Sequence, residues 1–74
     1  TYNNVMKRFR QDYADLCETD IRLFSYVVAQ FDAVLILKIF NLPSKDAVYM
    51  RKVRLKEKIR HSGSKDKDFY LLFF

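Results

Sequence analysis

The sequence predicts an all-α protein, a small bundle of four to five helices. One glycine and one proline are the only residues of their kinds among 74, so turns are few. Apolar residues recur at helical spacing along most of the chain. Half of all residues are hydrophobic and 16% are aromatic, which provides enough apolar mass for a core. A chain of this length is expected to form one domain with a core of limited size.

The first part of the chain predicts two helices separated by a break. Apolar residues from Val5 to Tyr13 share one helical face, and residues 13–16 interrupt the pattern. Thr19 is a suitable N-cap for the next helix, with Asp20 favourable in its first turn. The apolar spacing then continues until a short turn expected at residues 30–32.

Asp32 is a candidate N-cap for a short helix over residues 33–40. The segment 34–40 is apolar and partly β-branched, so a strand is the alternative, but no second strand-like run is available to pair with it. A helix that is apolar on nearly every side, apart from Lys38, is either buried all round or meets a partner or a second copy. The sequence leaves both interpretations open.

Leu42, Pro43 and Ser44 are the clearest break in the chain, because proline disfavours helix at the residue before it. Ser44 is a good N-cap for a helix over 45–60, and Gly63 is a candidate stop signal after that helix. A last short helix follows, carrying Phe69, Tyr70, Leu72 and Phe73. The predicted core consists of Ile21, Phe24, Val28, Ile36, Phe40, Val48, Leu55 and Ile59.

The net charge of +5 is concentrated in the helix predicted over residues 45–60. This segment holds seven basic and two acidic residues, and the rest of the chain holds seven of each. A block of positive charge on one element of an otherwise neutral domain is typical of a nucleic-acid reader. The alternative is a surface helix whose charges are only solvated.

Other function classes find little support in the sequence. A single cysteine excludes an internal disulfide and suits a reducing compartment. His61 has no partner at metal-ligand spacing, and nothing indicates a pocket around the aspartate pairs 12/15 and 66/68. We therefore expect no enzyme activity, no catalytic or metal site, no cofactor and no small-molecule ligand.

We expect neither a signal peptide nor a membrane span in this sequence. No apolar run approaches the roughly 20 residues of a membrane span. The polar start does not resemble a signal peptide, and without an initiator methionine the chain is expected to be a fragment of a longer one. We expect a cytoplasmic location, either free or at the cytoplasmic end of a membrane-anchored protein.

The helix at 33–40, the turn at 41–44 and the basic helix at 45–60 together form a helix-turn-helix arrangement, in which the second helix enters the major groove of DNA. Such a helix needs an apolar face for docking, which Val48, Leu55 and Ile59 provide. The opposite face and its flanks carry the residues available for contact: Lys45, Asp46, Tyr49, Met50, Val53, Arg54, Lys56, Glu57 and Lys58.

The ordered series from Leu16 to Ile59 resembles the LuxR-type (GerE-like) helix-turn-helix domain. Residues 16–24 are similar to its opening, with Cys17 at the position of a capping threonine. Ile36, Phe40 and Leu42 match the apolar positions of its second helix and turn. Residues 47–51 and 55–59 resemble the start and the end of its recognition helix. Residues 41–44 with 47–51 look most like a bacterial branch that ends sensor proteins of tetratricopeptide or two-component architecture.

The chain departs from the family pattern at several positions. Gln30 stands where the family usually has glycine, and Tyr49 where it has lysine. Residues 32–35 lack the family's lysine that contacts the DNA backbone, and the turn at Pro43–Ser44 is one residue longer.

The resemblance implies a DNA-binding output domain of a bacterial transcriptional regulator or signalling protein. Its core would span residues 16–74, preceded by an N-terminal helix within 1–15. The expected partners are double-stranded DNA, a second copy of the chain, and a membrane-bound sensor in the parent protein. The implied groove-facing residues are Tyr49, Met50, Val53 and Arg54, and the implied phosphate partners are Lys45, Lys56 and Lys58.

Two alternatives remain beside DNA binding. The first is a degenerate helix-turn-helix that serves as a protein-interaction or dimerisation module through residues 33–40. The second is binding of the basic helix to an anionic membrane surface, which is disfavoured because the apolar face of that helix is needed for the core.

Overall fold

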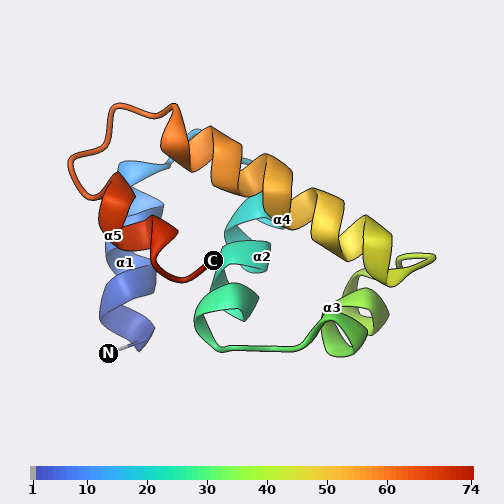
Figure 1. Cartoon of the computed structure of the whole chain (residues 1–74). Helices are drawn as coiled ribbons and strands as arrows, with labels where there is room; N and C mark the ends of the chain where they lie inside the picture. Colours follow the sequence, from blue (N-terminus) through green and yellow to red (C-terminus); the bar gives the residue numbers. More distant parts are fainter. Residues whose placement is uncertain (1) are drawn as a thin grey trace.

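A computed structural model describes residues 2–74, and in this range all regular structure is helical (Figure 1). The molecule measures 34 × 25 × 20 Å along its principal axes. The predicted all-α class is confirmed, and the alternative of a strand over 34–40 is wrong. The five helices are α1 (Tyr2–Asp12), α2 (Glu18–Val28), α3 (Ala33–Phe40), α4 (Lys45–Arg60) and α5 (Lys67–Leu71).

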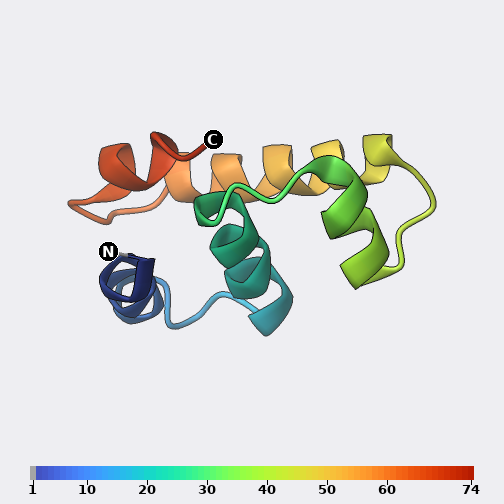
Figure 2. The ribbon, with the colours of Figure 1, turned by 90° about the horizontal axis from the view of Figure 1, so that it is seen from below.

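Helix α4 runs along the length of the molecule, and the other helices are arranged beneath it (Figures 1 and 2). α3 lies under the first turns of α4, α2 crosses beneath its middle, and α1 and α5 lie at its far end. α4 packs against α2, α3 and α5, whereas α1 packs against α2. The connection between α3 and α4 is four residues long, as the turn prediction required.

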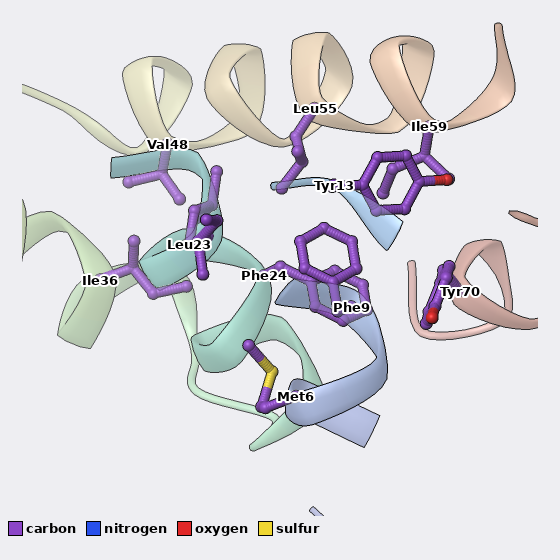
Figure 3. Packing of buried hydrophobic residues seen from close by; sticks show 11 residues of the cluster. Met6, Phe9, Tyr13, Leu23, Phe24, Ile36, Val48, Leu55, Ile59 and Tyr70 are labelled. Carbon is purple, nitrogen blue, oxygen red and sulfur yellow. The ribbon is translucent and has the colours of Figure 1, made fainter. Parts of the chain in front are cut away.

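The centre of the core is an aromatic cluster that joins three helices (Figure 3). The rings of Phe9 in α1 and Phe24 in α2 stack with their centroids 3.9 Å apart. Tyr70 of α5 meets both rings edge-on, with centroid separations of 5.2 and 5.7 Å. The two edge-on pairs have the geometry that adds to the stability from area burial. α1 therefore contributes to the same core as the rest of the chain.

Six of the eight predicted core residues are buried, and Val28 and Phe40 are half-buried against the cluster. The prediction missed buried residues in α1, α2 and α5 and the one that directly follows α1. These are Met6, Phe9, Tyr13, Leu23, Val27 and Tyr70.

Polar contacts connect α1 and the residue after it to the segment that follows α4. The hydroxyl oxygens of Tyr13 and Ser62 are 2.7 Å apart. The hydroxyl of Tyr70 donates to Oδ2 of Asp12 over 2.6 Å, and Ser64 donates to the same oxygen over 3.3 Å. Burial, together with the bond to the Asp12 carboxylate, raises the pKa of the Tyr70 phenol well above its ordinary value. The buried phenol is thus held in its neutral, donating form.

Two of the predicted helix starts are confirmed. Oδ1 of Asp32 accepts from the backbone N–H of Leu35 over 2.9 Å, and Oγ of Ser44 accepts from that of Ala47 over 3.3 Å. These caps satisfy donors that the first helical turn leaves unpaired.

Two terminus predictions are wrong. Helix α2 begins at Glu18 with Cys17 as its N-cap, so Thr19 lies inside the first turn. Cys17 makes no side-chain capping bond. Thr19 is predicted from the sequence because threonine is a better N-cap residue than cysteine and lies just before the first apolar residue of the helix, Ile21. Helix α4 ends at Arg60 with His61 as its C-cap, and Gly63 does not adopt a positive φ, so it is no left-handed stop.

Gln30 and Asn41 end α2 and α3 in the left-handed conformation, with φ of 63° and 55°. After each residue the chain closes a Schellman motif: the N–H of Phe31 donates to the carbonyl of Tyr26, and that of Leu42 to Leu37. Asparagine tolerates this conformation, whereas glutamine has no such preference. Gln30 therefore stands at a position that favours glycine.

Gln30→Gly is expected to raise the free energy of unfolding by about 0.5–1 kcal/mol. Relief of the left-handed backbone strain exceeds the added entropy of the unfolded chain. Ala29→Gly is the matched control, because Ala29 has a φ of −75° and gains no such relief; it is expected to destabilise by about 0.5–1 kcal/mol. Urea denaturation of the three proteins measures both effects, and equal losses for both variants would contradict the strain at Gln30.

Candidate nucleic-acid interface

Helix α4 presents one face to the core and the opposite face to solvent. Val48, Leu55 and Ile59 are buried, as the spacing predicted. On the opposite face Met50 is 50% exposed, and Arg54 is exposed as well. Tyr49, on the flank, is 66% exposed. These three predicted groove-facing side chains are therefore accessible to a partner.

Two of the seven bases of α4 are occupied by carboxylates. Nζ of Lys58 lies 2.6 Å from Oδ2 of Asp20 in α2, and this hydrogen bond raises the pKa of Lys58. Nη1 of Arg60 lies 2.9 Å from Oε1 of Glu57. Lys58, a predicted phosphate partner, thus serves first as a contact between α4 and α2.

The other five bases of α4 carry charge that no carboxylate neutralises. Within residues 2–74 none of them has an acidic oxygen at ion-pair distance. Two rows result at helical spacing, one on each flank of Met50. Lys45, Lys52 and Lys56 make up one row, and Arg51 and Arg54 make up the other.

Val53, a predicted groove-facing residue, and Lys56, a predicted phosphate partner, lie in a concave part of the surface. Both are half-buried in the wall of a hollow of about 360 Å³ beside α4. We refer to this feature, formed chiefly by Tyr49, Lys52, Val53 and Lys56 with Phe31 and Phe74, as the hollow. Val53 lines this hollow together with Phe73 and Phe74 from the C-terminal segment.

Arg22 of α2 is a base that sequence reasoning missed. Its guanidinium carbon lies 5.3 Å from the centroid of the Phe40 ring, and that of Arg51 lies 5.8 Å from the same centroid. The Phe40 ring thus makes cation–π contacts with one arginine of α2 and one of α4. The arginine row of α4 is extended by a residue from another helix. Only tertiary packing brings Arg22 there, so no local spacing signal could have found it.

The groups that the surface of α4 offers to a partner are cations and exposed apolar side chains. In the described part of the chain, residues 2–74, no group of three or more His, Cys, Asp or Glu side chains is placed to hold a metal ion. Cys17 is an exposed free thiol. None of the helices between residues 2 and 74 is both long and apolar enough to cross a bilayer.

Fold and surface together define a small all-α bundle with one strongly basic helix. Comparison of the chain with protein-family models, with curated proteins and with solved structures gave no match.

Proposed function

We propose that the chain binds double-stranded DNA through α4, as the output domain of a bacterial transcriptional regulator or signalling protein. The observation that carries the proposal is the position of the charge. The whole net excess of +5 lies on one helix that follows α3 after four residues, and five of its bases have no carboxylate partner within residues 2–74. The resemblance to LuxR-type domains supports the same function.

In the proposed complex the two basic rows contact phosphates on either side of the major groove. Lysine and arginine ammonium and guanidinium groups are the usual donors to phosphate oxygens. Met50 lies between the two rows, and Arg54 belongs to the arginine row beside it. Side chains at these positions can reach the edges of the bases in the groove. Arg22 adds a phosphate contact from α2.

Duplex binding is expected to depend steeply on salt. If four to six bases meet phosphates, log affinity falls with log salt concentration with a slope of about −4 to −5. The isolated chain is expected to bind with a dissociation constant on the order of micromolar or weaker. Fluorescence anisotropy with a random duplex at two salt concentrations measures both quantities. An affinity that does not change with salt, or no binding at low salt, would contradict DNA binding.

The second candidate function is a protein-interaction module, and the outer face of α3 favours it. Val34 and Leu35 are each 41% exposed and Ile39 is 37% exposed, while Ile36 is buried against the core. α3 therefore packs one face against the core and leaves an apolar outer surface exposed, which supports a contact with a partner or a second copy. If this surface meets a partner or a second copy, Val34→Asp abolishes that contact and leaves duplex binding unchanged.

A further inference from the structure

The hollow beside α4 has walls from three parts of the chain. α4 forms one wall, Val27 and Phe31 come from the end of α2 and its connection to α3, and Phe73 and Phe74 come from the segment after α5. The C-terminal residues line the hollow because the segment after α5 turns back toward α2 (Figure 1). Its volume of about 360 Å³ lies within the range of small-molecule sites, roughly 300–1,000 Å³.

The walls combine apolar rings with two adjacent cations. Phe31, Phe73 and Phe74 are half-buried and provide apolar surface. Lys52 and Lys56 are four residues apart on α4, so their side chains lie one above the other on the same flank. Neither ammonium group has a carboxylate partner in residues 2–74, and the residues lining the hollow include no acidic side chain.

This chemistry is complementary to one class of ligand. An anion placed between two unpaired ammonium groups receives charge-assisted hydrogen bonds. An apolar body attached to it leaves water for contact with aromatic walls. A ligand that has only the anionic group or only the apolar body makes only one of these two kinds of contact.

We propose that the hollow binds a small amphipathic carboxylate, with its oxygens on Lys52 and Lys56 and its aliphatic or aromatic body against Phe31 and Phe73. Tyr49, Lys52 and Lys56 belong to the proposed DNA surface as well, so an occupied hollow places a negative charge against two of the three lysines of one basic row. The carboxylate is therefore an inhibitor of duplex binding. This regulatory consequence rests on the proposed function, whereas the binding of the carboxylate does not.

The probe for the site is decanoate below its micelle concentration, measured by isothermal titration calorimetry on the full chain, with decanol as the uncharged analogue. One saturable site is expected for decanoate, with weaker binding of decanol. Lys52→Gln/Lys56→Gln is expected to weaken decanoate binding roughly tenfold or more. Lys7→Gln/Lys65→Gln is the matched control, because it removes two exposed lysines outside the hollow and the same net charge. Circular dichroism checks that each variant is folded.

Loss of affinity in both double variants alike, or no saturable binding of decanoate, would overturn the site. Competition with duplex DNA then tests the regulation. Weaker duplex binding in the presence of decanoate supports it, and an unchanged duplex affinity beside normal decanoate binding overturns the regulatory role. Decanoate binding by a chain that binds no duplex at all supports the site and overturns the proposed function, so the two failures are distinguishable.

Discussion

Leu55→Ala is expected to lower the free energy of unfolding by roughly 2–5 kcal/mol. Leu55 is fully buried, with a relative exposure of 0%, on the face of α4 that meets the core (Figure 3). Truncation removes apolar contacts and leaves a cavity between α4 and the helices beneath it. Because a domain of this size has a core worth only a few kcal/mol, the variant is expected to lose most of its stability. Thermal and urea denaturation followed by circular dichroism measure the loss.

Leu72→Ala is the matched control for this truncation. It deletes the same atoms from a side chain that is 81% exposed, so its effect is expected to stay within about 0.5 kcal/mol. If Leu55→Ala does not fold, the volume-conserving Leu55→Met is expected to fold with a loss below about 1.5 kcal/mol. A melting midpoint that Leu55→Ala leaves unchanged would mean that the assigned buried face of α4 is wrong.

The double variant Met50→Ala/Arg54→Ala is expected to separate DNA binding from stability. Both side chains are exposed and lie outside the buried face of α4, so the free energy of unfolding is expected to change by only about 0.5 kcal/mol. Duplex binding is expected to weaken much more, because a lost base contact costs about 1–3 kcal/mol and a lost phosphate contact reduces the salt slope by about 1.

Leu72→Ala/Lys7→Ala is the control for general charge, since it removes one exposed apolar side chain and one exposed base away from α4. It is expected to bind duplex DNA with nearly unchanged affinity and slope. A protein partner on α3 would still be bound by Met50→Ala/Arg54→Ala and lost in Val34→Asp. Unfolding of the double variant would show that its residues pack on the domain, and unchanged duplex affinity would remove the central residues of the proposed interface.

The fold was predictable from the sequence where a helix is defined by its own residues, that is, by apolar spacing along one face and by a capping residue at its start. Val48, Leu55 and Ile59 repeat at helical spacing, and Asp32 and Ser44 cap helices through their own side chains. Phe9 and Tyr70 were not identified as core residues, because their burial depends on each other across 61 positions of the chain. Their edge-on contact forms only when α1 and α5 meet beneath α4. No local pattern contains that pairing.

For the candidate site, only the positive charge and its location on α4 were predictable from the sequence. The clustering of seven bases is visible in the sequence, whereas the occupation of Lys58 by Asp20 requires the position of α2. The sequence did not predict the hollow or a small-molecule ligand, because the walls of the hollow come from distant parts of the chain: Val53 lies in α4, and Phe73 and Phe74 follow α5. Val53, predicted as a groove-facing residue, lines this hollow as well.

The burial of Tyr70 has a consequence for the order in which the protein is made. The ring is 0% exposed, stacks edge-on against Phe9 and Phe24, and binds Asp12 through its hydroxyl. During synthesis α1 to α4 emerge from the ribosome before this residue does, and the cavity that Tyr70 fills is then still open. Helix pairs close in sequence, such as α3 and α4, can form early, but the nascent chain cannot close its aromatic centre until residue 70 has left the exit tunnel.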